Sequence, residues 1–164
     1  MLPAKASLFM NNKDLISYLH PDLYIPELKA RGKNDAIKKM VTHLAKSDRV
    51  RNERIVIETL KSREQLGSTG IGKGIAIPHG RTTVTRELIV LFARSTKGIA
   101  FDASDGEPVH LFFMVLAPHV DKENQYLPLL GRIVEVTRSA TVRKQLLQAP
   151  DFEAMTAVLA KAEK

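Results

Sequence analysis

The chain has 164 residues, no cysteine and a formal net charge of +7. This length suits one domain whose core needs no disulfides, and the lack of cysteine excludes a thiol nucleophile and a zinc–cysteine site. The longest apolar runs are far too short to cross a bilayer, and no signal-peptide pattern precedes them. The sequence therefore predicts a cytoplasmic protein without membrane insertion.

The excess of positive charge lies in the first half of the chain. Residues 1–82 carry 15 basic and 8 acidic side chains, whereas residues 83–164 carry 10 of each. A basic face of this kind suits an acidic partner protein or a nucleic acid. Because aromatic residues are not interleaved with the basic ones, a solvated helix surface is the favoured interpretation, and no nucleic-acid partner is predicted.

The first elements predicted along the chain are mostly helical. Residues 1–12 lack periodicity and are predicted to form a loose leader before a single domain over residues 13–164. A short amphipathic helix at 14–19 precedes an extended edge segment at 23–25, which a proline follows. Two longer amphipathic helices are expected, one at 34–47 with Asn34 or Asp35 as its cap and one at 52–66 that ends at Gly67.

Residues 67–80 contain five glycines and are predicted to form a loop whose exposed N–H groups suit an anion. The hydroxyls of Ser68 and Thr69 add to this polar surface, and Pro78 stiffens the backbone before His79. A histidine placed there can act as nucleophile, general base, metal ligand or pH switch, although a lone histidine in such a turn is often only solvated. No Ser or Thr follows Lys73, so the loop is not a P-loop.

The second half predicts strands between helices. Apolar runs at 88–93 and 109–116 indicate strands buried on both faces, with turns at 97–98 and 105–106. A helix at 124–137 should direct Leu127, Leu130, Ile133 and Val134 to the core, and Ser139 and Asp151 should each cap a further helix. Helices on both sides of buried strands predict a layered α/β domain. No His, Asp or Glu spacing indicates a metal site.

Several motifs occur together and in a defined order. Residues 63–72 read Arg-Glu-Gln-Leu-Gly-Ser-Thr-Gly-Ile-Gly, and 76–80 read Ala-Ile-Pro-His-Gly; Gly98–Asp102, Asp105–Val109 and Leu116–Pro118 follow. Together they resemble the enzyme IIA domains of the phosphoenolpyruvate-dependent phosphotransferase system, of the mannitol/fructose class and its nitrogen-regulatory type. The resemblance covers about residues 13–159. It implies a central mixed β-sheet flanked by helices and no cofactor.

The resemblance also implies roles for individual residues. His79 corresponds to the phosphoryl acceptor, and Arg63 to the arginine that holds the phosphoryl group. Ser68, Thr69 and Gly80 correspond to phosphate contacts. The chain departs from the pattern at Tyr126, where the family usually has a second histidine; a tyrosine hydroxyl can donate a hydrogen bond, but the ring cannot become cationic.

The partner implied by the resemblance is an HPr-like (NPr) phosphocarrier protein that donates the phosphoryl group. The phosphorylation state would then regulate target proteins such as transporters or kinases. Two alternatives stay open at this point: a regulatory interaction module in which transfer is impaired, suggested by Tyr126, and a sugar-system component for fructose or mannitol uptake.

Overall fold

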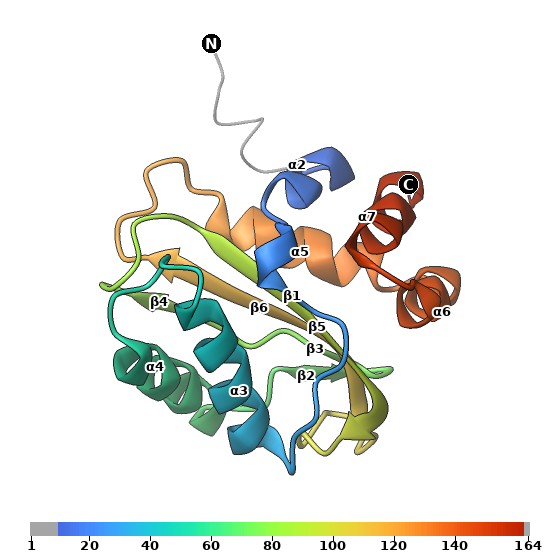
Figure 1. Cartoon of the computed structure of the whole chain (residues 1–164), viewed down its shortest axis with the longest axis horizontal. Helices are drawn as coiled ribbons and strands as arrows, with labels where there is room; N and C mark the ends of the chain where they lie inside the picture. The colour runs from blue at the N-terminus through green and yellow to red at the C-terminus, as the bar shows by residue number, and fades with distance from the viewer. Residues whose placement is uncertain (1–9, 163–164) are drawn as a thin grey trace.

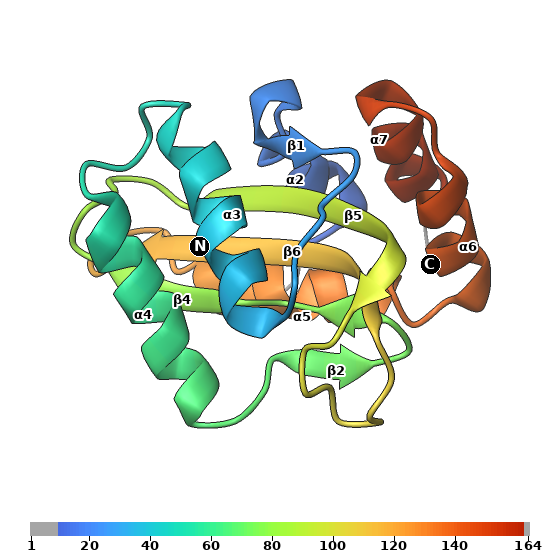
Figure 2. The same cartoon turned by 60° about the horizontal axis from the view of Figure 1, so that its bottom comes forward.

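A mixed sheet of six strands lies between two layers of helices (Figures 1 and 2). The structure is a computed structural model and describes residues 10–162. One face of the sheet is covered by α3 (Lys33–Ala45) and α4 (Glu53–Gln65). The other face is covered by α2 (Asn12–Ser17), α5 (Tyr126–Val136), α6 (Ala140–Gln148) and α7 (Phe152–Lys161). The predicted layered α/β fold with a central mixed sheet is confirmed.

The sheet is built around two long strands, β5 (Ile89–Ile99) and β6 (Val109–Pro118), which pair antiparallel. The strand order is β1-β5-β6-β3-β2, and β4 pairs with β6 beyond the end of β3. The pairings of β1, β3 and β4 with the long strands are parallel, whereas β2 and β3 form an antiparallel hairpin. The short strands are β1 (Tyr24–Ile25), β2 (Gly70–Gly72), β3 (Ile75–Ala76) and β4 (His79–Thr82).

The core has two halves because side chains along the central strands alternate between the faces of the sheet. On β6, Phe113 and Val115 pack toward α5 and α7, whereas Phe112 and Met114 pack toward α3 and α4. Both faces of β6 are therefore buried, which explains the unbroken apolar run in its sequence.

Most of the predicted helix starts agree with the structure. Asn52, Ser139 and Asp151 each accept a hydrogen bond from the backbone N–H three residues later, as N-cap residues do. The helix predicted at 34–47 is present as α3, but its predicted cap was wrong, because the N-cap is Gly32 and no side chain caps it. Asp35 lies in the first turn, and its carboxylate accepts the N–H of Arg31 instead.

The glycine-rich segment differs from the predicted loop, since residues 67–80 contain β2, β3 and the start of β4. The turn between β2 and β3 is tight because Lys73 and Gly74 both have positive φ, of 58° and 80°. Asp105, expected to form a turn, accepts hydrogen bonds from the N–H groups of Lys73 and Glu107. The hairpin is thus held by a carboxylate that lies 32 residues later in the chain.

Two boundaries and the buried face of one helix also differ from the predictions. The turn expected at 97–98 lies within β5, where Gly98 (φ 87°) sits at a shift of register opposite β6. Met10 is buried and Asn11 caps α2, so residues 10–12 belong to the fold rather than to a leader; residues 1–9 lie outside the described part. On α5, the predicted Ile133 is buried, but Leu127 is 69% exposed because the helix turns Tyr126, Leu129 and Val136 toward the core.

Candidate phosphoryl-transfer site

Strand β4 presents His79 at the edge of the sheet beside β6. Because side chains alternate along a strand, His79 and Arg81 face the α5 side, whereas Gly80 faces α4. A Cβ added at Gly80 would lie 2.9 Å from Cγ2 of Thr59 on α4. Gly80, expected among the phosphate contacts, therefore has a packing role as well: it lets α4 lie close against β4.

The ring of His79 is held in one tautomer by a backbone carbonyl two residues earlier in the chain. Its Nδ1 lies 2.6 Å from the carbonyl oxygen of Ile77, which can only accept, so Nδ1 carries the proton and Nε2 has the free lone pair. Burial lowers the pKa of His79 from its ordinary value; the charge of Arg63 adds to this effect, and the Ile77 contact and Glu64 oppose it. A neutral imidazole with Nε2 available is the nucleophilic form of the side chain.

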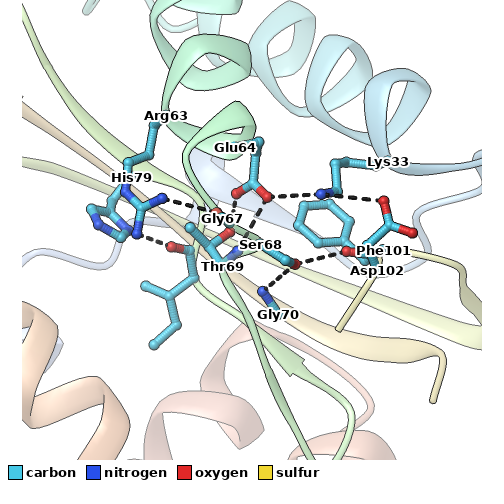
Figure 3. A network of polar contacts seen from close by, with 11 residues as sticks. Lys33, Arg63, Glu64, Gly67, Ser68, Thr69, Gly70, His79, Phe101 and Asp102 are labelled. Carbon is cyan, nitrogen blue, oxygen red and sulfur yellow. Dashed lines mark hydrogen bonds and ion pairs between the residues drawn. The ribbon is translucent and has the colours of Figure 1, made fainter. Parts of the chain in front are cut away.

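Arg63 lies in the last turn of α4, as predicted, and reaches toward His79 (Figure 3). Its Nη1 donates to the carbonyl oxygen of Gly67 at 2.9 Å, so the helix end and the loop after it hold the guanidinium together. Its charge acts on the pKa of both His79 and Tyr126. The structure therefore brings together the predicted acceptor and the predicted cation.

Tyr126 is the first residue of α5, and its ring is buried against His79, with 6.2 Å between the ring centroids. The carboxylate of Asp121 accepts its backbone N–H at 2.9 Å, which fixes the start of the helix. Burial raises the pKa of the Tyr126 phenol, against the opposing charges of Arg81 and Arg63. Tyr126 therefore stays neutral beside the acceptor.

Arg81 belongs to the same cluster and was missed by the sequence analysis. Its guanidinium carbon lies 4.6 Å from the centre of the Tyr126 ring, and we call these two residues the Arg81 pair. The signal was present in the sequence: in a strand, residue i + 2 from His79 must face the same side. The prediction of a loop over residues 67–80 leaves out this strand periodicity, which β4 shows.

Ser68 and Thr69 use their hydroxyls inside the protein. Ser68 Oγ donates to the carbonyl of Phe101 at 2.9 Å and accepts the N–H of Gly70 at 3.0 Å. Thr69 is 3% exposed, and its hydroxyl donates to the carboxylate of Glu64. Both hydroxyls are thus already paired, which differs from the expectation that they contact phosphate.

A buried ion pair supports the loop that follows α4. Glu64 is 7% exposed and lies 3.1 Å from Nζ of Lys33, and it also accepts the backbone N–H of Thr69 at 3.1 Å (Figure 3). We call Lys33, Glu64 and Thr69 the Glu64 network. Lys33 also lies over the ring of Phe101 and 3.5 Å from Asp102. Lys33 thus offsets part of the negative charge that Glu64 places near His79.

Within residues 10–162, no three His, Asp or Glu side chains gather in a way that would hold a metal ion. Over the same residues, every helix is too short or too polar to cross a bilayer. The groups gathered around His79 are its neutral imidazole, the guanidinium groups of Arg63 (Figure 3) and Arg81, and the buried phenol ring of Tyr126. This set of groups can hold an anion with three terminal oxygens next to a nucleophilic nitrogen.

Comparison with known proteins agrees with this geometry. The family described as "Phosphoenolpyruvate-dependent sugar phosphotransferase system, EIIA 2" matches residues 17–162. The chain belongs to this EIIA 2 family. Its fold also superimposes on the nitrogen regulatory protein IIA-Ntr from Neisseria meningitidis with a TM-score of 0.81 and 29% sequence identity, over 87% of this chain and 97% of that one.

Two relatives illustrate the range of the EIIA 2 family. A nitrogen regulatory protein from Bradyrhizobium diazoefficiens is 37% identical over 140 residues, which is 85% of this chain and 90% of that protein. The fructose-specific EIIABC component from Bacillus subtilis is 34% identical over 137 residues, which is 84% of this chain but 21% of that longer protein. The resemblance to the nitrogen-regulatory type is confirmed, and a phosphocarrier or regulatory role in the phosphotransferase system follows.

Proposed function

We propose that His79 accepts a phosphoryl group from an HPr-like (NPr) phosphohistidine protein. The observation that carries the proposal is the contact between Nδ1 of His79 and the Ile77 carbonyl, because it leaves the Nε2 lone pair as the nucleophile. Arg63 supports it, since a planar guanidinium can bind two phosphoryl oxygens at once. Alignment of donor and acceptor together with charge balance accounts for most of the catalysis in such transfers.

In the transfer step, the lone pair on Nε2 of His79 forms a bond to phosphorus while the N–P bond of the donor breaks. The electron pair of that bond returns to the donor's imidazole, which keeps the proton on its other nitrogen and so leaves as a neutral ring. The proton on Nδ1 of His79 stays where it is and continues to donate to Ile77. Ser68, Thr69 and Gly80 support the step through the loop and strand that they shape, since the two hydroxyls are paired internally.

Phosphorylation at this place changes the charge of the protein surface. A phosphoryl group adds close to two negative charges next to Arg63 and Arg81 and so reverses the local sign. A target protein that docks over the site would therefore distinguish the two states. On this basis the phosphorylation state regulates partners such as transporters or kinases, in nitrogen, carbon or ion-transport control.

The test is to incubate the protein with a phosphorylated HPr-like donor and to measure intact mass. We expect the addition of one phosphoryl group that is labile in acid and stable in base. His79→Gln should abolish it, whereas His119→Gln, which changes an exposed histidine after β6, should leave it intact. No modification with several different donors would remove the proposal.

The two alternatives have specific observations behind them. The neutral Tyr126 favours an interaction module in which transfer is impaired, and Tyr126→His tests it: a large gain in transfer rate supports impairment, and an unchanged rate argues against it. The similarity to a fructose-specific relative suggests the second alternative, a part in sugar uptake. Onward transfer from phosphorylated His79 to a purified fructose or mannitol IIB domain would support that second alternative.

A further inference from the structure

The Arg81 pair is the least expected feature of the site. Arg81 faces the same side of β4 as His79, and its guanidinium lies over the ring of Tyr126, which is itself in contact with His79. Apart from that ring, its nearest polar partner is the Pro118 carbonyl at 3.5 Å, a long and weak contact. The side chain is exposed, so its remaining N–H donors are open to a group that binds beside Tyr126 and His79.

We propose that Arg81 is a second phosphoryl-binding cation, and that Tyr126 positions it through the face of its ring rather than acting through its hydroxyl. This inference rests on the proposed function, because it concerns the phosphoryl group carried on Nε2 of His79. It makes Arg81 a catalytic residue and Tyr126 a positioning residue. The pair then supplies, at the place of the missing second histidine, a positive charge that tyrosine alone cannot supply.

The charge around the acceptor shows why a second cation is needed. A phosphoryl group in transfer carries negative charge spread over three oxygens. Arg63 supplies one guanidinium, and one of its nitrogens already donates to Gly67. Tyr126 stays neutral. Arg81 is then the nearby group in the described chain that matches the remaining charge, and a guanidinium also remains charged at every physiological pH.

The ring of Tyr126 suits this positioning role. A cation over an aromatic face is attracted electrostatically by the π electrons. This attraction does not use up the N–H donors of the guanidinium, which can still form hydrogen bonds with other partners. The ring is fixed by burial and by the bond between its backbone N–H and Asp121. Arg81 is therefore restricted in orientation without losing the hydrogen bonds that a phosphoryl group would need.

The balance of the transfer step is unchanged by this addition. The Nε2–P bond forms as the donor's P–N bond breaks, and the electron pair leaves with the donor nitrogen. Arg81 donates hydrogen bonds to the phosphoryl oxygens and gives up no proton. Its effect falls on the rate of transfer and on the lifetime of the phosphorylated protein.

The test uses the small donor phosphoramidate, which removes any contribution from protein docking. The rate of phosphorylation at His79 is followed by intact mass and by ³¹P NMR. Relative to the unmodified chain, we expect Arg81→Gln to be slower by about tenfold to a hundredfold, the scale of a charge-assisted hydrogen bond. Arg81→Lys should recover part of the rate. The matched control is Arg54→Gln, an exposed arginine about 14 Å along α4 from Arg63, and it should be unchanged.

Tyr126 variants separate its ring from its hydroxyl. Tyr126→Phe keeps the ring and should react within about twofold of the unmodified chain, whereas Tyr126→Leu should be slower by about twofold to fivefold, as expected for loss of an exposed cation–π contact. Adding Tyr126→Leu to Arg81→Gln should slow the reaction little further, since the two residues act together. Far-UV circular dichroism checks that each variant is folded.

The outcomes distinguish this inference from the proposed function. If the unmodified chain is not phosphorylated by any donor, both are overturned. If it is phosphorylated and Arg81→Gln reacts like Arg54→Gln, only the role of Arg81 is overturned. If Tyr126→Phe is as slow as Tyr126→Leu, the hydroxyl acts on the phosphoryl group, and the positioning role of the ring is wrong.

Discussion

The Glu64 network and the Arg81 pair flank His79 and hold their cations in different ways. The Glu64 network is buried; its charges are matched inside the protein, and it fixes the loop whose Gly67 carbonyl binds Arg63. The Arg81 pair has a buried ring but an exposed cation, with a single long polar contact. One side of the site is therefore rigid and positions a charge in advance, whereas the other side leaves a charge free to adapt to what binds.

The comparison also shows where stability and function separate. Burying an ion pair costs desolvation free energy, which the attraction between the charges offsets only when their hydrogen bonds are complete. Removing one partner therefore lowers the free energy of unfolding strongly. An exposed cation over a ring contributes little to folding. Substitutions in the Glu64 network should thus reduce the free energy of unfolding, and substitutions of Arg81 should act mainly on transfer.

The largest effect is expected when the Glu64 network is broken. Lys33→Met leaves the carboxylate of Glu64 buried without its cation, and we expect a loss of about 3–5 kcal/mol in the free energy of unfolding, measured with urea. Lys38→Met, an exposed position on the same helix, should change it by less than about 0.5 kcal/mol. Adding Glu64→Gln to Lys33→Met should restore part of the loss. Equal losses for Lys33→Met and Lys38→Met would show that the pair is not a stabilising contact.

A smaller effect is expected at the contact between α4 and β4. Gly80→Ala places a Cβ 2.9 Å from Cγ2 of Thr59, which should cost about 1–3 kcal/mol in the free energy of unfolding. Thr59→Ser removes that methyl group and should recover much of the cost in the double variant. Gly131→Ala, on a helix position with nothing within 4 Å of the added Cβ, should be neutral or stabilising. A neutral Gly80→Ala would mean that α4 can shift away from β4 without penalty.

The residues around His79 also show what the sequence can and cannot predict. Arg63 and the caps at Asn52, Ser139 and Asp151 were predictable, because helix ends and a short ordered motif are local signals. Arg81 needed only the knowledge that residues 79–82 form a strand. The pairing of Lys33 with Glu64 had no signal, since it depends on how α3 and α4 pack and joins residues 31 positions apart.

The register of α5 shows the same limit in another form. Helical spacing in residues 124–137 predicts an apolar stripe through Leu127, Leu130, Ile133 and Val134, whereas α5 buries Tyr126, Leu129, Ile133 and Val136. At the start of the helix, Asp121 binds the backbone N–H of Tyr126, and the ring of Tyr126 packs against His79. The buried face thus fits contacts outside the helix that its spacing alone does not encode.

The pH dependence of the free energy of unfolding tests His79, which lies between the Glu64 network and the Arg81 pair. Burial lowers the pKa of His79 below its ordinary value near 6.5, so the unfolded chain binds the proton more readily than the folded one. The contribution of neutral His79 to the free energy of unfolding is fully present above pH 6.5. It is lost as the pH falls from there through the lower pKa of His79 in the folded protein. We expect urea unfolding curves of the unmodified chain to lose more stability across this window than those of His79→Gln. Parallel losses would show that His79 titrates alike in both states.

The smallest effect on folding is expected at two exposed leucines, one beside each flanking region. Leu66 follows α4 next to the Glu64 network and is 85% exposed, and Leu127 follows Tyr126 and is 69% exposed. A water-facing leucine adds little to the core, so Leu66→Ser and Leu127→Ser should change the free energy of unfolding by less than about 0.5 kcal/mol. If the donor protein covers both sides of the site, each should raise KM for that donor by about threefold to tenfold, the scale of one apolar contact.

The same two variants should react with phosphoramidate at the unmodified rate, because that donor makes no contact with the leucines. Leu147→Ser is the matched control: this leucine is 40% exposed on α6, at the other end of the molecule from α4 (Figure 1). A rise in KM for Leu66→Ser alone would place the donor over the rigid side, and a rise for Leu127→Ser alone would place it over the adaptable side. A rise of equal size for Leu147→Ser would show that Leu66 and Leu127 have no special part in docking.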